Sequence, residues 1–110
     1  MKLIKSIVRP NKVDDVREAL ERLNVAGMTV SDVRGHGRQK GHTAVYRGKE
    51  YSVSLLPKVE IEVVVPDAVA EEVIEAIMAA ARTGEIGDGR VFVIHVEQSY
   101  NIRTGERDVS

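Results

Sequence analysis

Three glycines lie between Thr83 and Arg90, in the sequence Thr-Gly-Glu-Ile-Gly-Asp-Gly-Arg. Glycine has no Cβ, so the backbone can bend freely at Gly87 and Gly89, and its N–H groups can approach a ligand closely. Successive N–H groups that point inward form a concavity suited to phosphate oxygens, and Arg90 adds a two-pronged cationic donor. The spacing fits neither Gly-x-Gly-x-x-Gly nor the Lys-Ser/Thr ending of a P-loop. The segment therefore predicts either a phosphate-binding loop or a glycine-rich hairpin turn.

A second chemically distinctive stretch is basic. Residues 34–49 contain two histidines, no acidic residue and five cations, which are Arg34, Arg38, Lys40, Arg47 and Lys49. Such a run is either a solvated loop or a local patch that attracts a small anion or an acidic partner.

The composition excludes several classes of protein. The 110 residues predict a single domain, 1–110, and the absence of cysteine excludes disulfides, thiolate metal sites and a thiol nucleophile. A net charge of −1 argues against a general nucleic-acid binder. Because no apolar run reaches the length of a membrane span or a signal peptide, we expect a cytoplasmic protein without membrane insertion.

The first half of the chain reads as strand, helix, strand. Residues 3–9 are rich in Ile and Val and end at Pro10, after which Asn11 is a candidate helix cap. Helical spacing follows at Val13, Val16, Leu20 and Leu23. Gly27 ends this unit, and residues 28–34 predict a second strand.

The second half repeats this pattern. Residues 58–65 alternate as a strand, with Val59, Ile61, Val63 and Val65 on one face. Pro66-Asp67 opens a helix whose expected buried stripe is Val69, Val73, Ile77 and Ala80. Residues 91–96 predict the last strand.

This order predicts an α+β, ferredoxin-like split β-α-β fold (βαββαβ), in which an antiparallel sheet carries both helices on one face. The other face would display Lys58, Glu62 and Val64. An uncovered face on so small a domain suggests self-association. Between strands two and three, residues 37–56 form a long loop, a feature that is usually functional or mobile. Its weak strand character at Val45-Tyr46 and at residues 51–55 favours a flexible ribbon.

Taken together, these segments resemble the PII signal-transduction family over essentially the whole chain. The strongest matches are Arg34-Gly-His-Gly-Arg-Gln-Lys-Gly-His-Thr43, Tyr46-Arg-Gly-Lys-Glu-Tyr51, Leu56-Pro-Lys-Val-Glu-Ile-Glu62, Ala81-Arg-Thr-Gly-Glu-Ile-Gly-Asp-Gly-Arg90 and Ile102-Arg-Thr-Gly-Glu106. The resemblance implies a cytoplasmic homotrimer that binds ATP or ADP in three clefts between subunits. It also implies 2-oxoglutarate and Mg²⁺ beside the ATP, and docking of loop 37–56 on an ammonium channel or on nitrogen-metabolism enzymes and regulators.

The resemblance also assigns roles to residues. Residues 82–90 become the phosphate-binding loop, and 98–110 a C-terminal segment whose Arg103 approaches the nucleotide from the adjacent subunit. The implied nucleotide-binding residues are Gly27, Met28, Thr29, Gly35, Gly37, Arg38, Glu62, Val64, Gly87, Asp88, Gly89, Arg90 and Arg103. Those implied for 2-oxoglutarate are Gln39, Lys40 and Lys58, with Gln39 completing the Mg²⁺ shell. Tyr51 matches a tyrosine that a uridylylating enzyme modifies in some bacterial members.

Two positions depart from the family pattern. Asn101 stands where family members often have Arg, and Arg90 stands where Lys is frequent. Arg90 keeps the positive charge but presents a planar fork instead of a compact point charge. The nucleotide affinity and the preference between ATP and ADP therefore stay open.

The expected mechanism is that of an allosteric adaptor and not of an enzyme. ATP-Mg²⁺ and 2-oxoglutarate would assemble at the base of the long loop and reciprocally favour each other's binding. One alternative is weak ATP hydrolysis, and a second is a PII-like nucleotide regulator with a different effector. A third is a ferredoxin-like trimer that binds metal or acts as a scaffold, although His36, His42 and His95 lack clustered ligand spacing.

Overall fold

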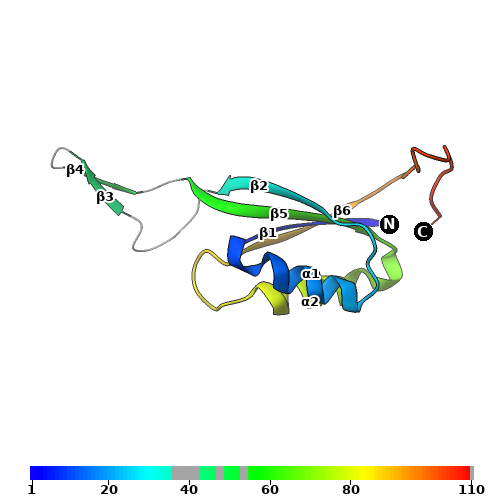
Figure 1. Ribbon diagram of the computed structural model, residues 1–110, viewed down its shortest axis with the longest axis horizontal. Helices are drawn as coiled ribbons and strands as arrows, with labels where there is room; N and C mark the ends of the chain where they lie inside the picture. The colour runs from blue at the N-terminus through cyan, green and yellow to red at the C-terminus, as the bar shows by residue number, and fades with distance from the viewer. Residues whose placement is uncertain (36–42, 47–48, 53–54, 110) are drawn as a thin grey trace.

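The computed structural model describes residues 1–35, 43–46, 49–52 and 55–109. Apart from the two short strands within the long loop, the elements follow the predicted order β-α-β, β-α-β (Figure 1). In chain order they are β1 (Lys2–Val8), a 3₁₀ turn (Pro10–Lys12), α1 (Val13–Arg22), β2 (Thr29–Gly35), β3 (Thr43–Tyr46), β4 (Lys49–Ser52), β5 (Leu56–Val65), α2 (Asp67–Ala81) and β6 (Gly89–His95).

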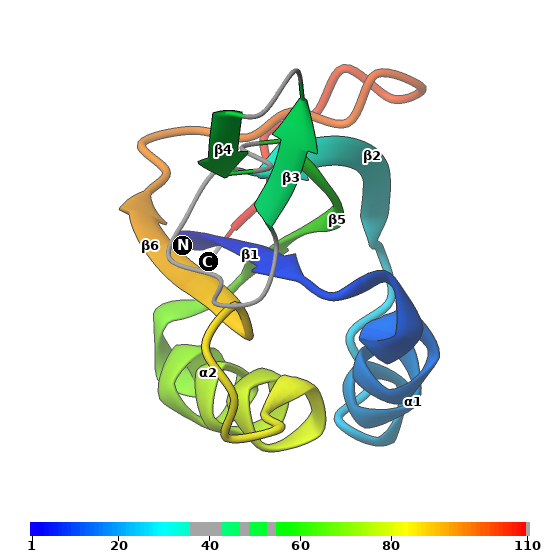
Figure 2. The same cartoon turned by 90° about the vertical axis from the view of Figure 1, so that its left-hand side faces the viewer.

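The main sheet has the order β2-β5-β1-β6, and every neighbouring pair is antiparallel. Both helices lie on one face of this sheet (Figures 1 and 2). We call the opposite, uncovered surface the open face. The arrangement confirms the predicted ferredoxin-like α+β fold.

The core lies between the helices and the sheet. Alternate residues of β1 and β5 point toward the helices, so Ile4 of β1 and Ile61 of β5 are fully buried. Val16 and Leu20 of α1 and Ile77 of α2 pack against them. No helix in the described ranges is long and apolar enough to cross a membrane.

The buried stripe of α2 differs from the predicted one at both ends. Val73 and Ile77 are buried as expected, but Ala70 and Ala81 complete the stripe in place of Val69 and Ala80. Val69 keeps 37% of its surface exposed. Apolar residues occupy two neighbouring stripes on this helix, and the one lined by small alanines permits the closer approach to the sheet.

The predicted cap of the first helix was wrong. Pro10–Lys12 form a 3₁₀ turn, Lys12 is the N-cap residue of α1, and no side chain caps it. Asn11 is therefore inside the turn instead of at the boundary. Strand β5 begins at Leu56, two residues earlier than expected, and β6 spans 89–95 instead of 91–96.

Part of the long loop forms a ribbon. β3 pairs with β4 in an antiparallel two-stranded sheet, with Thr43 opposite Ser52 and Tyr46 opposite Lys49. The ribbon lies at one end of the molecule, and the C-terminal segment lies at the other (Figure 1). The loop thus contains a ribbon, as predicted, but its strands are Thr43–Tyr46 and Lys49–Ser52 instead of 45–46 and 51–55. Residues 37–42, 47–48 and 53–54 of the loop lie outside the described residues.

Candidate functional site

The glycine loop, residues 82–89, connects the end of α2 to the start of β6. It meets β1 where Gly89 pairs with Val8. Gly84, Gly87 and Gly89 all have positive φ angles, of 92°, 100° and 114°. A Cβ on Gly89 would lie 1.7 Å from the backbone oxygen of Ile7. Glycine is therefore required at position 89 by the close approach to β1, whatever ligand the loop binds.

Asp88 folds the loop back toward the end of α2. Its Oδ2 accepts hydrogen bonds from the backbone N–H groups of Thr83 and Gly84, both at 2.8 Å, and its Oδ1 accepts one from the Thr83 hydroxyl. These donors, the hydroxyl first, hold the pKa of Asp88 well below its usual range, against the opposing effect of partial burial. The carboxylate is thus an internal acceptor that fixes the loop.

Arg9, which directly follows β1, supports the loop. Its Nε donates to Asp88 Oδ1 at 3.1 Å, and its Nη2 donates to the carbonyl oxygen of Ile86 at 3.0 Å. The Arg9 and Asp88 side chains are 24% and 23% exposed. Nothing in the local sequence predicted this role, because Arg9 and Asp88 are 79 residues apart in the chain.

Lys58 supports the loop from β5. Its Nζ donates to the carbonyl oxygen of Gly87 at 2.6 Å. The expectation that Lys58 is displayed on the open face was wrong: the residue is only 9% exposed, and its Cγ lies 3.0 Å from where a Cβ on Gly35 would stand. Burial, and then the nearby charge of Arg9, lower the pKa of Lys58, while Asp88 opposes that shift.

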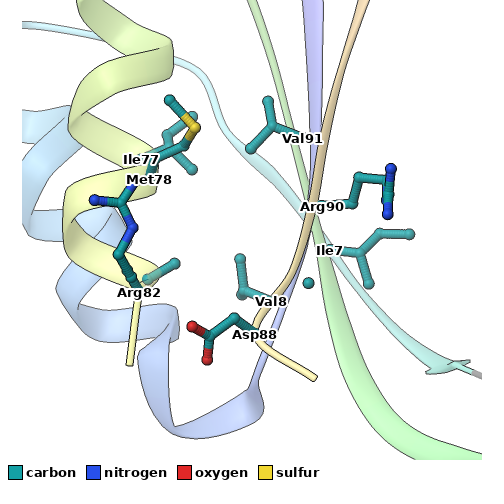
Figure 3. Close-up of a pocket in the computed structure, with 10 residues that line it drawn as sticks. Ile7, Val8, Ile77, Met78, Arg82, Asp88, Arg90 and Val91 are labelled. Carbon is teal, nitrogen blue, oxygen red and sulfur yellow. The ribbon is translucent and has the colours of Figure 1, made fainter. Parts of the chain in front are cut away.

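Arg90 and Asp88 point to opposite sides of the sheet (Figure 3). The Asp88 side holds a cleft of about 170 Å³ lined mainly by apolar side chains of α2, β1 and β6. That volume is below the range of about 300–1,000 Å³ usual for ligand pockets. The cleft is therefore small and mostly apolar, and the Gly87 and Asp88 N–H groups have no acceptor among the described residues.

A second group of predicted site residues meets around a hollow of about 410 Å³. It is lined by Leu3, Gly27, Thr29, Glu62, Val63 and Val64, and Thr29 lies directly opposite Glu62 in the sheet. Met28 is partly buried and packs against the core. Leu3 lies near the start of β1, whereas the glycine loop meets its end at Val8, a separation of about 17 Å along an extended strand. Within this single chain the two groups of residues therefore lie apart.

The family model described as "Nitrogen regulatory protein P-II" matches residues 1–106 of this chain. The chain belongs to the P-II family. It is 56% identical over 108 residues to the nitrogen regulatory protein P-II of Haemophilus influenzae, a match that covers 98% of this chain and 96% of that protein. It is 55% identical to nitrogen regulatory protein P-II 1 of Escherichia coli and 51% identical to nitrogen regulatory protein P-II of Rhizobium etli, with the same coverage. The predicted resemblance is confirmed.

Of the two departures from the P-II pattern, Arg90 is an exposed residue of β6 beside the glycine loop, whereas Asn101 lies in a separate C-terminal turn. Asn101 Oδ1 accepts hydrogen bonds from the N–H groups of Arg103, at 2.9 Å, and Thr104, at 3.2 Å. Asn101 thus closes a turn within the C-terminal segment. An isolated β-bridge between Tyr100 and Arg107 pairs the two sides of that segment. Arg103 is exposed on this segment, which lies at the opposite end of the molecule from the glycine loop (Figure 1).

The remaining predicted P-II site residues stay predictions. Gly37, Arg38, Gln39 and Lys40 lie outside the described residues. Tyr51 lies in β4, opposite Ala44. Across the described part of the chain, no group of three or more His, Cys, Asp or Glu side chains is placed to hold a metal ion.

Proposed function

We propose that this P-II family chain regulates nitrogen metabolism in the cytoplasm by binding ATP or ADP. The observation that carries the proposal is the glycine loop, which Asp88, Arg9 and Lys58 hold in place with the Gly87 and Asp88 N–H groups directed to no described acceptor. Arg90 follows immediately and supplies positive charge. A loop whose donors are fixed before the ligand arrives loses less conformational entropy when the phosphates bind.

The separation of the two groups of site residues supports a site between subunits of a homotrimer. The phosphate loop would come from one subunit, and Gly27, Met28, Thr29 and Arg103 from its neighbour, with Glu62 and Val64 beside the base and sugar. The open face supplies apolar surface for association: Val64, Leu3 and Ile94 lie side by side across three strands, and Val64 and Ile94 are 47% and 45% exposed. Exposed apolar patches of this kind mark interaction sites.

In this proposal Mg²⁺ and 2-oxoglutarate bind beside the ATP phosphates, at Gln39, Lys40 and Lys58. A metal between two anionic ligands removes their mutual repulsion, so each ligand favours the other, and linkage makes the effect reciprocal. The Lys58 bond to Gly87 supports a direct connection, because one side chain would contact both the glycine loop and the metabolite.

The output would be carried by loop 37–56, docking on an ammonium channel or on enzymes and regulators of nitrogen assimilation. Tyr51 would be the residue that a uridylylating enzyme modifies, and its place in the β3–β4 ribbon puts it at the end of the molecule away from the C-terminal segment (Figure 1). The chain would act through binding, with at most weak ATPase activity.

Calorimetry of the purified chain with ADP, ATP, and ATP-Mg²⁺ with 2-oxoglutarate tests the proposal, with light scattering to measure the oligomeric state. We expect a trimer that binds both nucleotides, and 2-oxoglutarate binding that requires ATP-Mg²⁺. A monomer, or a trimer that ignores millimolar ATP and ADP, contradicts the proposal.

Asn101 favours one alternative, a P-II-type nucleotide regulator with a different effector. Its amide oxygen is engaged with the N–H groups of Arg103 and Thr104, and it carries no charge for a phosphate. Nucleotide binding without any response to 2-oxoglutarate in the same calorimetry would favour this alternative.

A further inference from the structure

We propose that Arg9 is a positioning residue for the glycine loop, and that it sets the loop conformation in which the Gly87 and Asp88 N–H groups receive phosphate oxygens. The inference rests on the proposed function, since the ligand is taken to bear phosphate. Arg9 belongs to neither group of predicted binding residues, and its guanidinium reaches the loop from a different part of the chain.

The backbone conformation at Arg9 directs its side chain toward the glycine loop. Arg9 lies between the end of β1 and Pro10, and the residue before a proline is restricted to extended conformations. Its φ of −64° and ψ of 143° obey that restriction. Since β1 is paired on both sides, with β5 and with β6, the point from which the Arg9 side chain starts is fixed by the sheet.

The two Arg9 contacts constrain the loop on either side of Gly87. Nη2 holds the carbonyl oxygen of Ile86, and Nε holds the Asp88 carboxylate, so Gly87 lies between two anchored residues. Gly87 itself is anchored through its carbonyl oxygen by Lys58. With three consecutive residues held through oxygen atoms, the intervening N–H groups are oriented by the same peptide planes.

The fork of the guanidinium is essential to this arrangement. Two donors at a fixed separation hold two different acceptors, whereas the ammonium of a lysine is a single point charge on a flexible stem. Arg9 also offsets the charge of Asp88, so the carboxylate that folds the loop does not repel phosphate. Arg9 thus acts on the phosphates through its contacts with Asp88 and Ile86.

The test compares Arg9→Met, which removes the cation, with Arg9→Lys, which keeps the charge and loses the fork. Arg22→Met is the matched control, because Arg22 is an exposed arginine on α1 whose nearest carboxylate, in Glu18, is 3.9 Å away. We expect ADP to bind about tenfold or more weakly to Arg9→Met, and several-fold more weakly to Arg9→Lys. Arg22→Met should stay within about twofold of the parent.

Amide hydrogen exchange separates positioning from general destabilisation. In Arg9→Met the N–H groups of Thr83 and Gly84, which Asp88 accepts, should exchange faster, while those of the buried strand β5 keep their parent rates. Parent-like ADP affinity in Arg9→Met, or faster exchange throughout the molecule, would overturn the role of Arg9. If the parent itself binds no ADP, the proposed function fails, and the exchange comparison still decides whether Arg9 orders the loop.

Discussion

Two Thr-Gly-Glu turns occur in this chain, at residues 83–85 and 104–106, and they have the same internal geometry. In each, the central glycine has a positive φ, of 92° in the first and 72° in the second. In each, the threonine hydroxyl accepts a hydrogen bond from the glutamate N–H, at 3.1 and 3.2 Å. A side-chain oxygen, from Asp88 or from Asn101, closes each turn by accepting two backbone N–H groups.

The turns differ in what lies beyond them. Asp88 also accepts from Arg9, and the neighbouring Gly87 carbonyl accepts from Lys58, so the first turn is attached to two strands of the sheet. The second turn is held within its own segment, by Asn101 and by a Ser99–Asp108 hydrogen bond of 2.7 Å. A neutral amide is sufficient for a local turn, but a carboxylate is needed where the same side chain must also hold a cation. The same short motif thus serves as a fixed loop in one place and as a self-contained arm in the other.

Replacing one glycine in each turn region with alanine should give the largest difference in stability between the two regions. Gly89→Ala should destabilise the fold by about 2–5 kcal/mol, because left-handed strain adds to a clash with the Ile7 backbone oxygen. Gly105→Ala has a positive φ but no atom within 4 Å of the new Cβ, so its cost should be about 1 kcal/mol. Urea unfolding measures both, and equal losses would show that contact with β1 does not distinguish the two regions.

Removing the charge of Asp88 should have the next largest effect. Asp88→Asn leaves one oxygen acceptor and places an amide N–H₂ against Arg9 and the Thr83 hydroxyl, so unfolding free energy should fall by about 1–3 kcal/mol. ADP binding should weaken as well. Asn101→Asp is the converse exchange, and thermal unfolding should change by much less because the Asn101 turn holds no cation. A stable Asp88→Asn with parent-like ADP affinity would contradict the role assigned to the carboxylate.

The stabilisation that the Asp88 carboxylate provides should depend on pH. Because the folded-state pKa of Asp88 lies below its ordinary value of 3.8, the stabilisation is fully present above that value and is lost as the pH falls below it. The difference in melting temperature between the parent and Asp88→Asn should stay constant between about pH 8 and pH 5 and shrink in more acidic buffer. A difference that already fades on going from about pH 8 to pH 6 would indicate another titrating group.

The smallest effect is expected at the second turn. Asn101→Ala removes the acceptor of the Arg103 and Thr104 N–H groups, which are exposed and will bond to water instead. Hydrogen exchange at these two groups should accelerate, while the melting temperature of the whole chain stays within about 1 °C of the parent. A melting temperature as low as that of Asp88→Asn would show that the segment is attached to the core.

The sequence was sufficient for the fold because its periodicities are strong. Alternation at Val59, Ile61, Val63 and Val65 fixes which face of β5 is buried, and the positions of the remaining strands and both helices follow from similar patterns. The sequence did not predict which residues form the two ends of the buried stripe of α2, because two neighbouring stripes of this helix are apolar.

The candidate site was predictable only in part, for a physical reason. The glycine spacing points to a phosphate loop without any knowledge of the fold. Arg9 and Lys58 contact that loop only after the sheet brings β1 and β5 beside it, and neither contact leaves a signal in the sequence near residue 88. Long-range support of a loop has to be read from the tertiary structure.

The Arg9–Asp88 contact has a consequence for the order of events during biosynthesis. The contact joins residues 79 positions apart, so it can form only after residue 88 has been synthesised. A nascent or truncated polypeptide that ends before residue 88 contains the sequences of both helices but lacks the carboxylate that closes the loop. Closure of the loop therefore requires most of the chain to have been synthesised, although Arg9 is among the first residues made.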